Sequence, residues 1–139
     1  MNDAVLLDTC AVIWLANGEP MHQDALAAIV HAGLHGGIWV SPISAWEIGM
    51  LSKARPGRAG IVRFMPDPKT WYARFMAGPG IHEAAFTQDI AIASSWLPGD
   101  VHGDPADRLI IATARQLGLP VITRDRKIIA YEEVSVIVC

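Results

Sequence analysis

The amino-acid sequence predicts an α/β protein, a three-layer α/β/α sandwich with a mostly parallel central sheet. Short apolar runs of strand length alternate along the chain with longer segments of helical periodicity. Strands that alternate with helices in this way pair in parallel, because each helix carries the chain back across the sheet. The 139 residues are 52% hydrophobic, enough to bury a core, and we expect one domain over residues 1–139.

The first half of the chain contains two predicted strands with their helices. Residues 4–8 (AVLLD) form an apolar strand, and residues 9–17 continue with helical spacing. Residues 22–34 form an alanine-rich helix that stops at a pair of glycines. Residues 38–42 (IWVSP) form the second strand, closed by a proline, and residues 44–54 form the helix that follows it.

The second half repeats the alternation. Residues 67–78 open with a capping aspartate and form a short helix, and residues 80–84 (GIHEA) form an edge strand. A threonine opens a helix over residues 87–97, and a long helix over residues 104–118 ends at a glycine. The remaining predicted elements are a strand over residues 119–123, a short helix over residues 124–131 and a last strand over residues 134–138.

The bulk composition excludes several classes of protein. No apolar run approaches the roughly 18 residues of a membrane span, and MNDAVLLDTC lacks the basic and apolar regions of a signal peptide. Cys10 and Cys139 have no zinc-site spacing and are expected to be free thiols in a reducing cytoplasm. A net charge of −3 argues against a simple basic nucleic-acid binder. It leaves a nuclease open, because an acidic metal site itself lowers the net charge.

Asp8 and Asp125 each follow a predicted strand and precede a helix. Taken alone, each is explained as an N-cap, because a carboxylate oxygen accepts a free backbone N–H at that position. The end of a strand in a parallel sheet is also where ligands bind. The local pattern therefore leaves a structural and a functional interpretation open for both residues.

Glu47 has an equally simple structural explanation. It ends the tetrapeptide SAWE, a capping-box pattern in which Ser44 caps the helix and Glu47 reaches back to its amide. The apolar neighbours Trp46, Ile48 and Leu51 predict a buried helix, however, and we expect Trp46 in the core. A carboxylate in such a helix needs a compensating partner.

Two aspartates lie close together in GDPADR, residues 103–108. Asp104 before Pro105 fits an N-cap followed by proline at the first helical position. Asp107 then occupies the third helical position, where the helix dipole stabilises an acid. Both therefore have a structural role, and the pattern does not decide which of them does chemistry.

Together, these acids are difficult to explain as caps alone. We predict four of them beside four strand-to-helix junctions, which a parallel sheet brings to one edge. Gathered negative charges repel one another unless a cation neutralises them. Oxygen ligands without clustered Cys or His select Mg²⁺ or Mn²⁺. The residues therefore predict an acidic metal site, whose default chemistry is phosphodiester hydrolysis.

The chain resembles the PIN domain, in particular the VapC-like toxin ribonucleases of bacterial type II toxin–antitoxin systems. The matching segments occur in family order and cover essentially the whole chain: LLDTCAVIWL, SPISAWEIGML, HGDPADRLIIATARQLGLPVITRD and IIAY. The resemblance implies a Mg²⁺- or Mn²⁺-dependent endoribonuclease that acts in the cytoplasm. It also implies a homodimer that a cognate antitoxin inhibits.

The resemblance assigns roles to individual residues. The four acids of the family match Asp8, Glu47, Asp107 and Asp125. These four would bind the metal and carry catalysis. Thr9 and Thr123 match supporting hydroxyl positions, and Asp104 keeps its cap role with the option of holding a metal-bound water.

Basic residues near the acids predict contacts with RNA phosphates. The candidates are Arg108, Arg124, Arg126 and Lys127. A second basic stretch runs from Lys53 to Arg63. The alternative for each is a solvated surface charge, and Arg108 has the further option of an ion pair with a neighbouring acid.

Two other functions remain open. A receiver-like signalling domain also places acids at strand ends, but it needs an acidic pair near the first strand and a lysine after the last. Here Asp3 lies too early, and VSVIVC offers no lysine. A PIN-like domain that only binds RNA or a partner is the second alternative, and the presence of all four acids argues against it.

Overall fold

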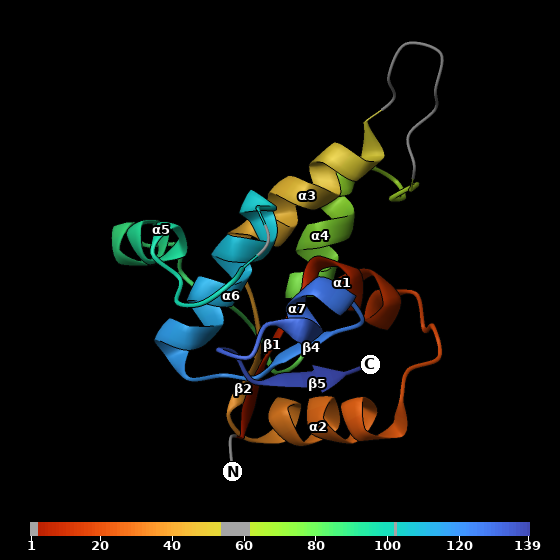
Figure 1. Cartoon of the computed structure of the whole chain (residues 1–139). Coiled ribbons are helices and arrows are strands. Elements are labelled where there is room, and N and C mark those ends of the chain that lie inside the picture. The colour runs from red at the N-terminus through yellow and green to blue at the C-terminus, as the bar shows by residue number, and fades with distance from the viewer. Residues whose placement is uncertain (1–2, 54–61, 102) are drawn as a thin grey trace.

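The computed structural model describes residues 3–53, 62–101 and 103–139, and its elements follow the predicted order (Figure 1). The strands are β1 (Ala4–Leu7), β2 (Gly37–Val40), β3 (Ile81–Glu83), β4 (Val121–Thr123) and β5 (Val136–Val138). The helices are α1 (Thr9–Ala16), α2 (Gln23–Leu34), α3 (Pro42–Ser52), α4 (Pro68–Met76), α5 (Gln88–Ser95), α6 (Pro105–Leu117) and α7 (Arg126–Ala130). Every predicted strand and helix is present, with some ends displaced.

The sheet is parallel throughout, with the strand order β3-β2-β1-β4-β5. The predicted edge strand is confirmed, because β3 lies at one edge. The chain builds outward from β1 to β3 and then crosses over to place β4 on the other side of β1. In open α/β sheets, ligands bind at such a switch point, outside the carboxyl ends of the strands.

The same strand order tests the receiver-like alternative. Receiver domains share the flavodoxin-like order 2-1-3-4-5, in which the switch lies between the first and third strands. Here the switch lies between β1 and β4, with two strands on each side of β1. The receiver-like interpretation is therefore wrong.

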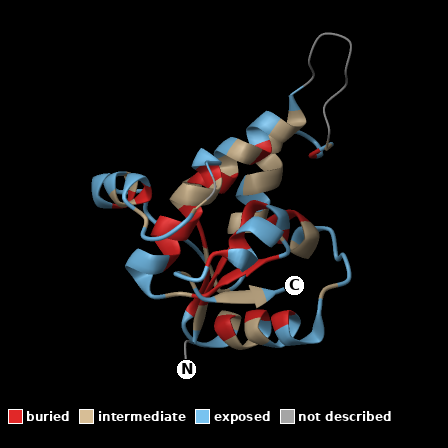
Figure 2. Ribbon diagram, viewed as in Figure 1, coloured by how far each residue is buried: buried red, intermediate tan, exposed pale blue. Residues whose placement is uncertain are grey.

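Helices cover both faces of the sheet, so the three-layer prediction is confirmed (Figure 1). α2 lies along one face, where Ile29 belongs to the same buried cluster as Val5 and Leu7. α6 covers the other face, where Ile110 packs with Leu6. Successive residues of β1 thus pack against opposite layers. Figure 2 shows that the inner strands and the sheet-facing sides of these helices are buried, whereas β5 at the edge is partly exposed.

α3 and α4 pack together and extend away from the sheet (Figure 1). Ile48 is buried on the packed side of α3, whereas Trp46 is 59% exposed. The expectation that Trp46 belongs to the core is therefore wrong. The physical reason is that α3 projects beyond the sheet, so that only the side facing α1, α4 and α6 is covered.

Two further expectations concern the chain as a whole. None of the helices in the described ranges is both long and apolar enough to cross a membrane. Cys10 and Cys139 are free thiols, as predicted, the first exposed and the second buried.

Candidate active site

The central strand β1 and its neighbour β4 are each followed by one of the predicted acids. Asp8 follows β1 and Asp125 follows β4, and these strands pair directly. Each aspartate also caps a helix, with Oδ1 of Asp8 accepting from the Ala11 amide at 2.8 Å and Oδ1 of Asp125 from the Lys127 amide at 2.8 Å. Capping occupies one oxygen of each carboxylate, so it does not exclude a second role.

Thr123, the last residue of β4, connects these two acids. Its hydroxyl donates to Oδ2 of Asp8 and accepts from the Asp125 amide, the latter at 2.9 Å. The Thr123 side chain is fully buried. Thr123 therefore holds the Asp8 carboxylate in place at the switch point of the sheet.

Glu47 lies deeper in its helix than the capping-box pattern predicts. Ser41 caps α3, its hydroxyl accepting from the Ile43 amide at 3.1 Å, and Pro42 occupies the first helical position. Ser44 and Glu47 lie inside the helix, so the predicted capping box is wrong. The helix starts earlier because Ser41 supplies the cap directly after β2, and proline suits the position that follows a cap.

Thr9 provides the hydrogen bond that holds Glu47. Its hydroxyl donates to Oε1 of Glu47 at 2.5 Å, and Oγ1 of Thr9 also lies 3.0 Å from Oγ of Ser44. Ser44 is fully buried, and Thr9 is 5% exposed. Ser44 and Glu47 share one side of α3 because they are three residues apart. This spacing is the signal by which Ser44 could have been recognised as part of the site.

α6 begins where it was predicted to begin. Oδ1 of Asp104 accepts from the Asp107 amide at 3.2 Å, and Pro105 occupies the first turn together with Asp107. α6 leads into β4 through Gly118, whose φ of 67° favours glycine. The start of α6 therefore lies at the carboxyl edge of the sheet, close to the ends of β1 and β4.

The expectation of four strand-to-helix junctions is wrong in two places. Asp8 and Asp125 occupy such junctions, but Glu47 lies within α3, and Asp107 opens a helix that follows α5. The acids nevertheless influence one another. Burial raises the pKa of Asp8 to about 6, with hydrogen bonds opposing this and the charges of Asp107 and Asp125 adding to it. Burial also raises the pKa of Glu47, and its acidic neighbours raise it further.

The acidic edge suits a hydrated divalent cation. No three His, Cys, Asp or Glu side chains among the described residues are arranged to share one metal ion as they stand. The donors are carboxylate oxygens, the type that Mg²⁺ and Mn²⁺ prefer. Mg²⁺ in proteins is commonly held by one or two carboxylates, with waters completing its octahedron. The residues that could hold it are Asp8, Glu47, Asp107 and Asp125.

Arg124, one of the predicted RNA contacts, is engaged within its own chain. Nε donates to the Cys139 carbonyl at 2.7 Å, and one terminal nitrogen donates to the Pro20 carbonyl at 2.6 Å. The guanidinium also lies 3.8 Å from the centre of the Trp14 ring. These contacts join β5, α1 and the loop after β4, which gives Arg124 a structural role that no local sequence pattern indicates.

The other predicted RNA contacts differ in how far they are exposed. Arg126 and Lys127 are exposed at the start of α7, next to Asp125. Arg108 is half-buried, and its Nε donates to the Ser94 carbonyl at 3.0 Å. Much of the second basic stretch, residues 54–61, lies outside the described residues.

Comparison with known proteins relates this fold and site to a family. The PIN domain model matches residues 5–134 of the chain. A curated relative, ribonuclease VapC22 of Mycobacterium tuberculosis, is 31% identical over 125 residues, which cover 89% of this chain and 88% of the relative.

Solved structures share the fold at lower identity. VapBC2 from Rickettsia felis, bound to a DNA fragment from the promoter, matches with a TM-score of 0.70 and 15% identity, covering 97% of this chain and 98% of that one. A toxin–antitoxin complex from Klebsiella pneumoniae matches with a TM-score of 0.60 and 21% identity, covering 96% and 95%. The chain belongs to the PIN-domain family and is a VapC-like member of it.

Proposed function

We propose that this chain is a Mg²⁺- or Mn²⁺-dependent endoribonuclease, the toxin of a toxin–antitoxin pair. The observation that carries the proposal is electrostatic: burial raises the pKa of Asp8 and Glu47, and the charges of Asp107 and Asp125 raise both further. Such a group of acids destabilises the folded protein unless a cation neutralises it. The relation to ribonuclease VapC22 supports RNA as the substrate.

In this proposal the protein's own groups hold the reacting parts in place. Thr123 and the Ala11 amide hold Asp8, and Thr9 holds Glu47. A bound divalent cation supplies a polarised water and offsets the negative charge of the scissile phosphate. The carboxylates would hold that cation and would accept the proton of the attacking water.

We also propose that RNA approaches from the side of α7. Arg126 and Lys127 lie directly after Asp125 and are exposed. Their positive charges would attract the RNA backbone to an edge of the sheet that is otherwise acidic. The charge of Arg124 adds to this attraction, although its guanidinium is occupied by contacts within the chain.

An antitoxin that covers the acidic edge and a homodimer of this chain complete the proposal. The toxin–antitoxin complex from Klebsiella pneumoniae, with which the chain shares its fold, supports an antitoxin as the partner. Copurification of the chain with a small protein expressed from the neighbouring gene, and the mass of the complex, would test both points. A monomer that binds no such protein would contradict them.

The central test is RNA cleavage by purified protein freed of any antitoxin. We expect cleavage in Mn²⁺, loss of cleavage in EDTA, and recovery when Mn²⁺ is added back. Asp107→Asn is expected to be folded and inactive. A folded wild type that binds RNA without cutting it would favour the non-catalytic alternative, and full activity of Asp107→Asn would contradict the four-acid site.

A further inference from the structure

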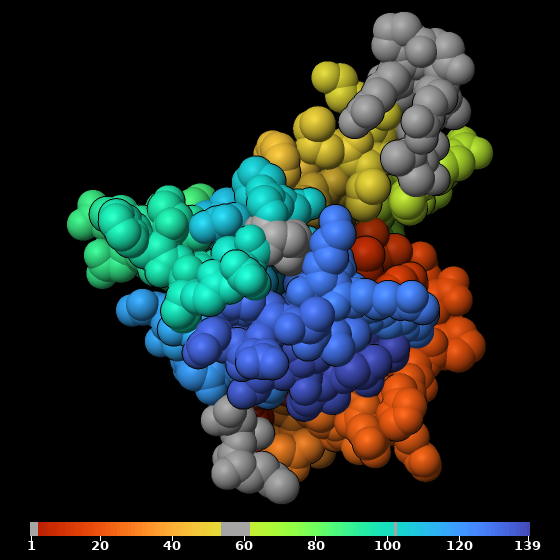
Figure 3. Space-filling model, viewed as in Figure 1, coloured from red at the N-terminus to blue at the C-terminus, as the bar shows by residue number. Residues whose placement is uncertain are grey.

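A hollow of about 390 Å³ lies between the end of α5 and the start of α6. It is lined by Ser94, Ser95, Gly103, Pro105, Arg108 and Leu109. α5 packs against α6, and Figure 3 shows the two elements side by side on one face of the molecule. Asp104 lies between two lining residues, and Asp107 directly precedes Arg108. The hollow therefore adjoins the acidic edge of the sheet.

Arg108 brings a positive charge to this hollow in a restrained orientation. Its Nε donates to the Ser94 carbonyl at 3.0 Å, so the guanidinium is anchored at one nitrogen. Within the part of the chain that the structure describes, no carboxylate lies at ion-pair distance from the Arg108 guanidinium. A planar guanidinium that retains two terminal NH₂ groups matches the geometry of a phosphate.

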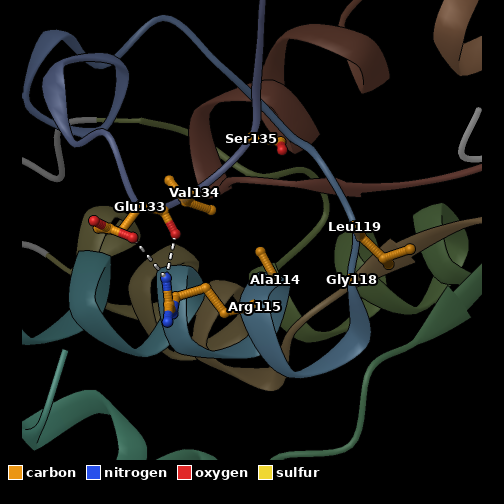
Figure 4. Close-up of a pocket in the computed structure, with 7 residues that line it drawn as sticks. All are labelled: Ala114, Arg115, Gly118, Leu119, Glu133, Val134 and Ser135. Atoms are coloured by element: carbon orange, nitrogen blue, oxygen red, sulfur yellow. Dashed lines mark hydrogen bonds and ion pairs between the residues drawn. The ribbon is translucent and has the colours of Figure 1, made fainter. Parts of the chain in front are cut away.

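Other arginines of the described chain have different surroundings. Arg115, on the same helix, donates to the Glu133 carbonyl and lies 3.9 Å from Oε2 of Glu133 (Figure 4). Arg124 is occupied by two carbonyls and the Trp14 ring. Arg108 thus combines proximity to the acids with a guanidinium that the described residues leave partly unused.

We propose that this hollow binds a backbone phosphate of the RNA on one side of the scissile phosphate, with Arg108 as its ligand. The inference rests on the proposed ribonuclease function and adds a second anchoring point for the strand. Ser95 contributes an exposed hydroxyl to the lining, and Leu109 and Pro105 contribute apolar surface for the attached ribose. A strand held at the acids and at Arg108 crosses the start of α6, which fixes its direction across the site.

The first test measures RNA binding without cleavage. Single-stranded RNA is titrated with Asp8→Asn protein by fluorescence anisotropy at several NaCl concentrations, with and without Arg108→Gln. Losing a charge-assisted contact should weaken binding about tenfold. The slope of log K against log salt should also fall by about 0.7, the share of one phosphate on a single strand. Arg115→Gln is the matched control, because it removes the same charge from the same helix, and it should leave both quantities unchanged.

The second test remains informative even if Arg108→Gln also weakens the packing of α5 on α6. Each phosphate of the RNA is replaced in turn by an uncharged methylphosphonate. We expect the substitution at one phosphate to weaken binding to the protein that retains Arg108 and to have no further effect on the Arg108→Gln protein. Substitutions at the other phosphates should weaken binding to both proteins equally. Equal effects at every position, or an unchanged salt slope, would overturn the phosphate site.

The two proposals fail in different ways. If wild type cuts RNA in Mn²⁺ but Arg108→Gln behaves like Arg115→Gln, the phosphate site is overturned and the ribonuclease function stands. If wild type neither binds nor cuts RNA, both are overturned. Cleavage by wild type together with a position-specific loss in Arg108→Gln supports both.

Discussion

Asp8 and Asp67 cap different helices with closely similar hydrogen bonds, yet their pKa values move in opposite directions. Each accepts at Oδ1 from the amide three residues ahead at 2.8 Å, and at Oδ2 from a threonine hydroxyl. Asp67 is exposed, and its hydrogen bonds to Thr70 lower its pKa. Asp8 is buried, and desolvation outweighs its hydrogen bonds and raises its pKa to about 6.

The difference lies in where the second hydrogen bond originates. The threonine that serves Asp67 belongs to the same helix, whereas Thr123, which serves Asp8, lies on a strand far along the chain. The cap motif decides where a helix begins, and the surroundings decide what the carboxylate can do. A carboxylate that long-range contacts keep buried beside other acids is a candidate functional group, because a structural cap needs no such environment.

The largest expected difference between the two caps is in activity. Asp8→Asn preserves the cap but removes a charge that would hold the cation, so RNA cleavage should fall at least about 100-fold, more than removal of an outer-shell partner typically costs. Asp67→Asn also preserves its cap and should leave cleavage unchanged. Rates measured in Mn²⁺ with a fluorescent RNA test this. Equal rates for wild type and Asp8→Asn would show that Asp8 is only a cap.

The next difference is in stability and its pH dependence. A pKa raised from 3.8 to about 6 means that Asp8 resists ionisation in the folded protein, so it destabilises the fold increasingly between these pH values and constantly above them. Asp8→Asn should therefore raise the free energy of unfolding of the metal-free protein by up to about 3 kcal/mol above pH 6. This gain in stability should vanish near pH 4. Adding Mn²⁺ should reduce the difference in free energy of unfolding between the two proteins, because the ion stabilises wild type.

For Asp67→Asn, the same measurement should show a change in the free energy of unfolding of the opposite sign. The pKa of Asp67 is lowered by folding, so its contribution to stability is present above the unfolded pKa and is lost as the pH falls through the folded value. Urea unfolding of both variants between pH 3 and pH 8 would show the two trends. A loss of stability in Asp8→Asn at neutral pH would contradict the assigned direction.

The fold was largely readable from the sequence because its signals are local. Apolar runs such as AVLL and VIT mark strands, and Asp104 with Pro105 marks the start of α6. The same rule, a capping residue followed by proline, applied to Ser41 and Pro42 would have placed the start of α3 correctly. The SAWE pattern was misleading because a capping box can also match residues inside a helix.

The long-range contacts of the site were not readable in the same way. The hydroxyl of Thr9 reaches Glu47 on another helix, and Arg124 reaches Pro20 and Cys139 from opposite ends of the chain. No spacing rule connects such residues, because the crossover of the sheet brings them together. The residues singled out the acids and the family resemblance assigned their roles, which stay a prediction; Glu47 and Asp107 lie on helices that no strand pattern would have placed beside Asp8.

A smaller effect on metal binding is expected from removing the threonine hydroxyls that donate hydrogen bonds to the carboxylates. Thr9→Val removes the hydrogen bond to Glu47 while preserving the shape of the side chain. Because outer-shell partners orient metal ligands, the affinity for Mn²⁺ should fall about 10–100-fold. Thr70→Val, which removes the hydroxyl beside Asp67, is the matched control and should leave Mn²⁺ affinity unchanged. Calorimetric titration measures both, and Thr9→Ser should restore binding. Unchanged affinity in Thr9→Val would show that Glu47 needs no such support.

The smallest expected effect separates Asp104 from Asp107. Asp104 accepts from the Asp107 amide as the cap of α6, so Asp104→Ala should lower the free energy of unfolding by about 1 kcal/mol. Asp104→Asn can still accept this hydrogen bond and should retain both stability and most of the RNA cleavage, in contrast to Asp107→Asn. Crystals soaked in Mn²⁺ would show by anomalous scattering which carboxylate contacts the ion. Direct coordination by Asp104, together with inactivity of Asp104→Asn at unchanged stability, would reverse the two assignments, because a residue that acts only as a cap has no reason to require its charge for cleavage.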